Sequence, residues 1–127
     1  MIEQRPRILV VDDEESIGQV LKAGLGMYGF TVRCEACSTD TIKSCLEFHP
    51  DLVLLDIDMP VKDGGEVASE LRSHPTLRRT PVIFLSSLVT KEETGKRNAS
   101  REILLSKQVP IAELVASIRA VLQPNVR

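Results

Sequence analysis

Acidic, hydroxyl and basic side chains follow four short apolar runs of this sequence. They are Asp12 with Asp13, Asp56, Ser86 with Ser87, and Ser106 with Lys107. Carboxylates that lie close together repel one another, and protonation or a bound cation relieves that repulsion. Oxygen ligands from two or three carboxylates suit a hard cation, above all Mg²⁺, which keeps several waters and often bridges to phosphate. No His or Cys follows these runs, so a zinc site is not expected.

Phosphoryl transfer onto a carboxylate is the reaction that this set of residues could support. Asp56 is the expected nucleophile, because it stands alone after four apolar residues, whereas Asp12 and Asp13 are the expected metal ligands. Mg²⁺ would neutralise two phosphoryl oxygens, Lys107 would offer its charge to a third, and the Ser86 hydroxyl would donate a hydrogen bond. The alternative interpretation is a solvated acidic rim, since Asp commonly caps the start of a helix.

The apolar runs predict the strands that must position these side chains. They cover residues 8–11, 52–55, 82–85 and 103–105. Runs so short and so continuously apolar indicate strands buried on both faces, as in a parallel sheet. Residues 31–36 alternate polar and apolar side chains, as an edge strand does. Because ligands of open α/β sheets bind outside the carboxyl ends of the strands, we expect the polar residues to meet at that edge.

Helical patterns separate the predicted strands. They cover residues 17–28 before Gly29, 39–48 behind a Ser38 cap, 65–73, 91–99, and 111–122 after Pro110. The pattern at 91–99 is the weakest, because it is polar almost throughout and contains Gly95. Five strands that alternate with five helices predict right-handed crossovers and a three-layer α/β sandwich.

The composition is that of one globular domain. The 127 residues carry 16 Lys and Arg against 18 Asp and Glu, a formal net charge of −2, and 43% of them are hydrophobic. No apolar run approaches the roughly 20 residues of a membrane span, and the first residues lack the apolar stretch of a signal peptide. We therefore expect a cytoplasmic protein with no membrane partner. The near-neutral charge argues against a nucleic-acid partner.

Three cysteines, Cys34, Cys37 and Cys45, form an odd set in a chain without an export signal. Reduced thiols are expected in such a protein. The alternative is a redox pair of Cys34 with Cys37, but such pairs usually stand at a helix N-terminus, and Cys34 lies in a predicted strand.

Taken together, these motifs resemble the receiver domains of two-component response regulators. The resemblance covers about residues 7–122 of a single domain spanning 1–127. It rests on residues 10–14, 51–60, 63–64 and 81–86 and on Lys107. It implies a flavodoxin-like fold, in which the five-stranded parallel sheet has the order 2-1-3-4-5.

The resemblance also implies a role for each site residue. Asp56 resembles the phosphoacceptor, Asp12 and Asp13 the metal ligands, the Asp58 backbone carbonyl a further Mg²⁺ oxygen, Ser86 the switch hydroxyl and Lys107 the phosphate-binding lysine. A histidine kinase or a histidine phosphotransfer protein would be the donor. Apart from this self-catalysed transfer and hydrolysis, no enzyme activity is expected. The output would be a changed surface that binds a downstream protein, with no DNA-binding module in this chain.

Several positions depart from the family pattern. Gln108 follows Lys107, where the family usually has a proline with a cis bond; a cis bond to Gln would cost about 2.5–4 kcal/mol, so we expect a trans bond and a changed position of Lys107. Leu104 replaces an aromatic residue that turns inward on activation, and residues 98–101 replace a small, acidic turn. A carboxylate at Asp58 could either steer or repel an attacking water. The catalytic positions are intact, while the output positions are altered.

Three other functions compete with this interpretation. The segment Asp56-Ile57-Asp58 also resembles the Asp-x-Asp of haloacid-dehalogenase-like phosphohydrolases, but that motif normally follows the first strand. An FMN-binding flavodoxin shares the fold, yet residues 12–15 are all acidic and would repel a phosphate that has no bound metal. A receiver that binds partners without being phosphorylated is the third alternative, because the output positions are altered.

Overall fold

A mixed β-sheet forms the centre of the computed structural model, which describes residues 5–87, 96–97 and 102–123. The strands are β1 (Arg7–Val11), β2 (Thr31–Glu35), β3 (Leu52–Asp56), β4 (Val82–Ser86), β5 (Lys96–Arg97) and β6 (Ile103–Ser106). The helices are α1 (Glu15–Met27), the short 3-10 helix η1 (Ser38–Asp40), α2 (Thr41–Phe48), α3 (Gly64–Ser73) and α4 (Ile111–Leu122). None of the helices in these described ranges is long and apolar enough to cross a membrane.

The order of the strands is β2-β1-β3-β4-β6-β5, and the first five of them in this order are parallel. This confirms the predicted order 2-1-3-4-5 and the edge position of residues 31–35. The additional strand, β5, pairs antiparallel with β6, Lys96 opposite Leu104. Strand order reverses beside β1 and β3, the point where open α/β sheets bind their ligands.

The helix predicted over residues 91–99 is wrong at Lys96–Arg97, which form β5; the other residues of that prediction lie outside the described ranges. This stretch has no apolar face to pack as a helix, whereas the edge of β6 offers unpaired backbone groups. The described ranges therefore hold four α-helices and one 3-10 helix rather than five helices.

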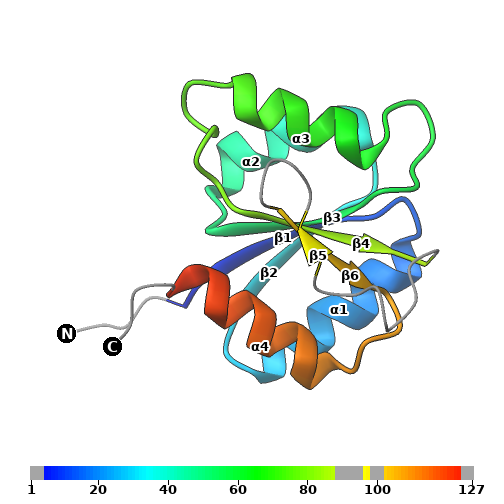
Figure 1. The fold of residues 1–127 in the computed structure, drawn as a ribbon, viewed down its shortest axis with the longest axis vertical. Helices are drawn as coiled ribbons and strands as arrows, with labels where there is room; N and C mark the ends of the chain where they lie inside the picture. Colours follow the sequence, from blue (N-terminus) through cyan, green and yellow to red (C-terminus); the bar gives the residue numbers. More distant parts are fainter. Residues whose placement is uncertain (1–4, 88–95, 98–101, 124–127) are drawn as a thin grey trace.

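Helices cover both faces of the sheet (Figure 1). A hydrophobic core lies on each face, as the alternation of side chains along a strand requires. Ile8, Val10 and Leu54 pack with residues of α1 and α4, whereas the neighbouring Leu9 and Leu55 pack with residues of α2 and α3. Because both faces are covered by helices, β1 and β3 are buried almost completely. Burial on both faces explains why their sequences are continuously apolar.

The helix ends follow local sequence signals. Gly29, with φ +95°, ends α1; its N–H donates to the Gly26 carbonyl at 3.1 Å, as predicted for this glycine. The predicted Ser38 cap is replaced by η1, and the Ser38 hydroxyl donates instead to the Pro60 carbonyl at 3.3 Å. A capping box starts α3: Asp63 accepts from the Glu66 N–H, and Glu66 accepts from the Asp63 N–H.

Candidate functional site

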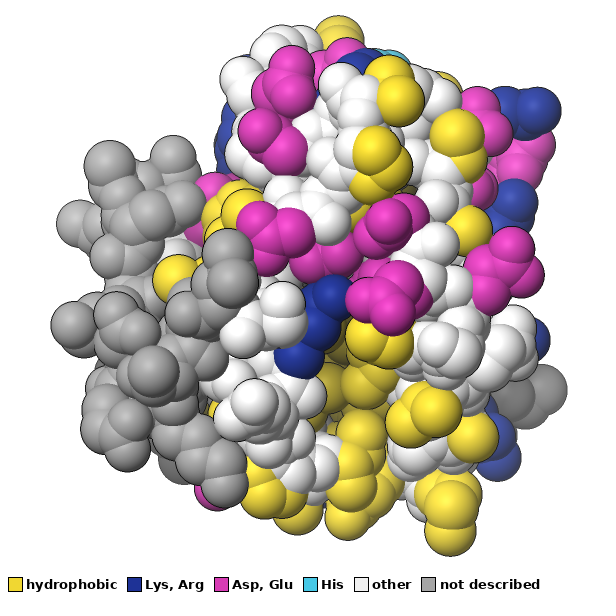
Figure 2. Space-filling model, turned by 90° about the vertical axis from the view of Figure 1, so that its right-hand side faces the viewer, with side chains coloured by type: hydrophobic (Ala, Val, Ile, Leu, Met, Phe, Trp, Pro, Cys, Tyr) yellow, Lys and Arg dark blue, Asp and Glu magenta, His cyan; other side chains and the backbone are white. Residues whose placement is uncertain are grey.

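The carboxyl ends of the parallel strands bring the predicted polar residues together. Asp12 directly follows β1, Asp56 ends β3, Ser86 ends β4 and Lys107 directly follows β6. Figure 2 shows acidic side chains gathered on this side of the molecule, a basic group beside them and a hydrophobic groove below. The sheet therefore assembles one site from residues that are up to 95 positions apart in the sequence (107 minus 12).

Three carboxylates form a group that could hold a metal ion. Asp12, Asp13 and Asp56 each offer an oxygen, and these oxygens lie within 4.8 Å of one another. Asp12 and Asp56 are 3% and 2% exposed, whereas Asp13 faces solvent. The buried Oδ2 of Asp12 lies 2.8 Å from the Lys107 ammonium. An oxygen-only group with two buried carboxylates and one that is open to solvent fits Mg²⁺, which retains waters.

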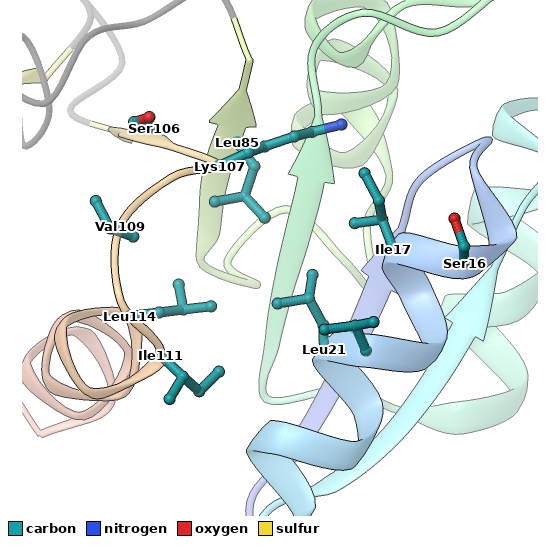
Figure 3. Close-up of a pocket in the computed structure, with 10 residues that line it drawn as sticks. Ser16, Ile17, Leu21, Leu85, Ser106, Lys107, Val109, Ile111 and Leu114 are labelled. Atoms are coloured by element: carbon teal, nitrogen blue, oxygen red, sulfur yellow. The ribbon is translucent and has the colours of Figure 1, made fainter.

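Lys107 supplies the countercharge to this group. Its Nζ lies 2.8 Å from Asp12 Oδ2 and 3.3 Å from Asp56 Oδ1, and in Figure 3 the side chain passes Leu85 and extends away from the groove. Burial alone would lower the pKa of Lys107, but its hydrogen bond with Asp12 and the charges of Asp12 and Asp56 outweigh this and raise the pKa. Lys107 is therefore a fixed positive charge in the site.

The departure at Gln108 is accommodated by local hydrogen bonds. The Lys107–Gln108 peptide is trans, as predicted, since no cis bond occurs in the described ranges. The Gln108 N–H donates to Ser106 Oγ at 3.0 Å, a bond that a proline could not make. The Lys107 N–H donates to the Ser86 carbonyl at 3.0 Å. The trans backbone thus still delivers the Lys107 ammonium to both buried carboxylates.

Asp56 carries a perturbed carboxyl group. Burial, and then the charge of Asp12, raise its pKa from the ordinary 3.8 to about 6, against the opposing effects of the Asp58 N–H and Lys107. The Asp58 N–H donates to Asp56 Oδ1 at 3.1 Å. A carboxylate that is costly to keep ionised, beside a fixed cation, is typical of a reactive group.

The turn between β3 and α3 is packed tightly against Asp56. The Gly64 N–H donates to the Ile57 carbonyl at 3.0 Å. A Cβ on Gly64 would lie 2.5 Å from the Asp56 carbonyl oxygen, so only glycine fits there. The Asp58 side chain, which sequence reasoning did not connect with Ser86, accepts a hydrogen bond from the Ser86 hydroxyl at 3.3 Å. The spacing of Asp63 and Glu66 in the sequence is that of a capping box, and it could have predicted that α3 begins directly after this turn.

Ser87 and Leu104 are two further positions that the sequence singled out. Ser87 is exposed, and Leu104 is half-buried and packs against the core under α2 and α3. Residues 98–101 lie outside the described ranges.

All three cysteines are free thiols. Burial raises the pKa of Cys45 to about 11 and also raises that of Cys34, whose Sγ contacts the Gly18 carbonyl oxygen at 3.1 Å. Neither the position nor the chemistry of Cys34 supports a redox pair.

An apolar groove runs from the site between α1 and α4. Its volume is about 340 Å³. Aliphatic side chains from both helices and from the strands between them line it, with polar groups at one end (Figure 3). The lining residues are Ser16, Ile17, Val20, Leu21, Leu85, Ser106, Lys107, Val109, Ile111 and Leu114. The groove thus provides an apolar surface directly beside a charged site.

This chain belongs to the response regulator receiver domain family, whose family model matches residues 8–119. It is 35% identical over 119 residues to the transcriptional regulatory protein PrrA of Mycobacterium tuberculosis, covering 93% of this chain and 50% of that protein. It is 38% identical over 86 residues to the regulatory protein AtoC of Escherichia coli, covering 68% of this chain and 18% of that one. The chain therefore spans about half the length of PrrA and much less of AtoC.

Solved structures share the fold. The BeF3-activated N-terminal receiver domain of Klebsiella pneumoniae RstA is 28% identical, with a TM-score of 0.78 over 92% of this chain and 98% of that one. A response regulator from Desulfuromonas acetoxidans is 25% identical, with a TM-score of 0.81 over 95% and 99% of the two chains. Receiver domains are not conventional enzymes. These comparisons do not support the phosphohydrolase or the phosphorylation-independent module.

Proposed function

We propose that this receiver domain accepts a phosphoryl group on Asp56 in a Mg²⁺-dependent reaction. One observation carries the proposal: the Asp56 carboxyl is 2% exposed at the end of the central strand β3, 3.3 Å from the Lys107 ammonium and within 4.8 Å of the Asp12 and Asp13 oxygens. The Asp56 carboxylate thus has one cation and two further carboxylates as close neighbours. Such a site is suited to the charge of a phosphoryl group.

In the proposed reaction, a carboxylate oxygen of Asp56 attacks the phosphorus of a phosphohistidine. A P–O bond forms, the P–N bond breaks, and its electron pair goes to the imidazole nitrogen of the donor. Lys107 faces the new negative charge, and the Ser86 hydroxyl donates to a phosphoryl oxygen. Hydrolysis of the acyl phosphate returns Asp56 to a carboxylate and releases inorganic phosphate.

Asp12, Asp13 and Asp56, with the Asp58 backbone carbonyl, would hold the metal ion. The three side-chain oxygens that these aspartates place within 4.8 Å of one another support this ligand set. When bound, Mg²⁺ supplies positive charge that offsets the carboxylates and the phosphoryl oxygens. Lys107 then no longer faces Asp12 and Asp56 alone, and its ammonium is available to the phosphoryl group.

The donor is a protein histidine, from a histidine kinase or a histidine phosphotransfer protein. The apolar groove between α1 and α4 supports a protein donor, because it adjoins Lys107 and would take aliphatic side chains next to the reacting histidine. Val20, which lines the groove, is 71% exposed. Phosphorylation then shifts Ser86 and Lys107 and favours a second form of a surface that binds a downstream protein.

Intact-protein mass spectrometry tests the proposal. The protein is incubated with Mg²⁺ and acetyl phosphate, and Asp56→Asn and a metal-free sample are run beside it. We expect one added phosphoryl group on the wild type and none on either control. Absence of a mass gain from the wild type over a range of times and donor concentrations would overturn the proposal.

A further inference from the structure

The turn after β3 carries a carboxylate whose side chain the proposed phosphoryl transfer does not use. Asp58 is exposed, yet its Oδ2 accepts a hydrogen bond from the hydroxyl of Ser86 at 3.3 Å. Ser86 is 3% exposed and ends β4, 28 positions further along the chain. An exposed carboxylate can be satisfied by water, so this contact is not needed to solvate Asp58. Its effect is on the direction in which the buried hydroxyl points.

The backbone holds Asp58 in place for this contact. Its N–H donates to Asp56 Oδ1 at 3.1 Å, and the preceding Ile57 N–H donates to the Leu85 carbonyl at 3.1 Å. These two bonds fix the turn relative to β3 and to β4. Asp58 thereby contacts the expected phosphoacceptor through its backbone and the expected switch hydroxyl through its side chain.

We propose that Asp58 is a positioning residue that restrains the Ser86 hydroxyl in the unphosphorylated protein and opposes the shift of Ser86 toward a phosphoryl group. The inference rests on the proposed function. A hydroxyl has one hydrogen to donate, so Ser86 donates either to Asp58 or to a phosphoryl oxygen on Asp56. Phosphorylation must therefore break the bond to Asp58, and the strength of that bond sets how completely the phosphorylated protein switches.

The chemistry of the acceptor determines the strength of the restraint. A charged carboxylate is a stronger hydrogen-bond acceptor than a neutral amide. Asp58→Asn keeps an acceptor oxygen without the charge, and Asp58→Ala removes the acceptor. Both variants keep the Asp58 backbone carbonyl, the atom proposed as a Mg²⁺ ligand. The three proteins therefore form a series of decreasing restraint on Ser86 with an unchanged backbone.

The first test uses metal-free, unphosphorylated protein. Because the Lys107 N–H donates to the Ser86 carbonyl, ¹H–¹⁵N spectra report a change at Ser86 through the amides of Ser86 and Lys107. We expect both amide signals to move in Asp58→Ala and to move less in Asp58→Asn. Asp58→Ala in a Ser86→Ala background should leave the Lys107 amide close to its position in Ser86→Ala alone. Unmoved signals in the Asp58→Ala single variant would overturn the restraint.

The second test is a double-mutant cycle on binding of beryllofluoride, an analogue of the phosphoryl group, at saturating Mg²⁺. Removing Asp58 also removes a negative charge near an anion site, and this effect persists in a Ser86→Ala background. The restraint acts only through Ser86. We expect Asp58→Ala to tighten beryllofluoride binding about fivefold more in the Ser86 background than in the Ser86→Ala background. Equal effects in the two backgrounds would overturn the proposal.

The two tests also separate this inference from the proposed function. If the wild type neither gains a phosphoryl group nor binds beryllofluoride, the proposed function fails, and the metal-free spectra still decide whether Asp58 restrains Ser86. If the wild type is phosphorylated and the amides of Ser86 and Lys107 do not respond to Asp58→Ala, only the restraint fails.

Discussion

Lys107 and Asp12 form an ion pair inside the acidic site, with Nζ 2.8 Å from Oδ2 and the two side chains 13% and 1% exposed. The pair joins the end of β1 to the end of β6, across two intervening strands of the sheet. In this arrangement the ammonium of Lys107 partly offsets the charge of the buried carboxylates. Because Lys107 balances these buried charges, we expect the stability of the fold to depend on Lys107 and on whether a cation is bound at the site.

Lys107→Met should destabilise the metal-free protein at pH 7.5 by about 2–3 kcal/mol, because it leaves buried carboxylates without a countercharge. Saturating Mg²⁺ should reduce that loss, since a bound cation supplies the missing charge. Urea unfolding with and without Mg²⁺ measures both quantities. Lys62→Met is the matched control: Lys62 pairs with Glu70 at 2.6 Å near the surface, and its loss should cost less than about 1 kcal/mol in either condition. An equal loss for Lys107→Met with and without Mg²⁺ would contradict the prediction.

The perturbed pKa of Asp56 predicts how stability depends on pH. With the pKa raised from 3.8 to about 6, the folded metal-free protein binds more protons than the unfolded chain between these values. The free energy of unfolding should therefore decrease as pH rises from about 4 to 6 through this group and stay at the lower value above pH 6. A carboxyl ¹³C titration should place the Asp56 midpoint near 6 without metal and lower with Mg²⁺. Asp56→Asn should remove this part of the pH dependence of the free energy of unfolding. A midpoint near 4 for Asp56 in the metal-free wild type would refute the prediction.

The strands and the meeting of the polar residues at one edge of the sheet could be predicted from the sequence because burial imposes strong requirements. A strand covered by helices on both faces, such as β1 or β3, must be continuously apolar, and the polar residue that follows such a strand must lie at the sheet edge. Asp12, Asp56 and Lys107 were found in this way. Their residue types, rather than any local pattern, indicated a site for phosphate and a hard cation.

The features that the sequence did not predict depend on contacts between distant segments or on backbone conformation. The strand at Lys96–Arg97 forms because β6 offers an edge, which a stretch of polar residues does not signal. The contact of Asp58 with Ser86 depends on how one turn is fixed against β4. Val61 adopts a positive φ of 68°, although a β-branched residue disfavours it.

Gly64→Ala should destabilise the fold by about 1–3 kcal/mol, because its Cβ would lie 2.5 Å from the Asp56 carbonyl oxygen and 2.8 Å from Ile57 Cα. Both contacts are with backbone, so the turn must move. Gly65→Ala is the matched control: its Cβ meets only Asp63 Oδ1 at 3.4 Å, and the higher helix propensity of alanine should stabilise α3 by about 0.5–1 kcal/mol. Thermal unfolding of both variants measures the difference, and destabilisation by both alike would count against the close packing at Gly64.

Val20→Glu should slow phosphorylation by a protein donor about tenfold or more without changing phosphorylation by acetyl phosphate, because a charge in the apolar groove opposes packing of the donor. The donor is a phosphorylated kinase or phosphotransfer protein that phosphorylates the wild type. Met27→Glu is the control: Met27 is 88% exposed at the end of α1, about 10 Å further along the helix. If the rate of phosphorylation by the protein donor falls equally for both variants, or falls for neither, the groove is not part of the surface that docks the donor.

Val61→Gly should stabilise the protein by about 1 kcal/mol. Val61 is the central residue of a three-residue turn in which the Lys62 N–H donates to the Pro60 carbonyl at 2.7 Å, and its positive φ strains a β-branched side chain. The side chain is 90% exposed, so glycine loses little packing, and relief of the strain exceeds the entropy cost of glycine. Urea unfolding at constant m-value measures the change.

The exposed Val20 provides the control of opposite sign for Val61. It lies inside α1, where valine has an allowed backbone conformation and glycine lowers helix propensity, so Val20→Gly should destabilise by about 0.5 kcal/mol. Destabilisation by Val61→Gly would contradict the prediction and mean that Val61 makes a compensating contact.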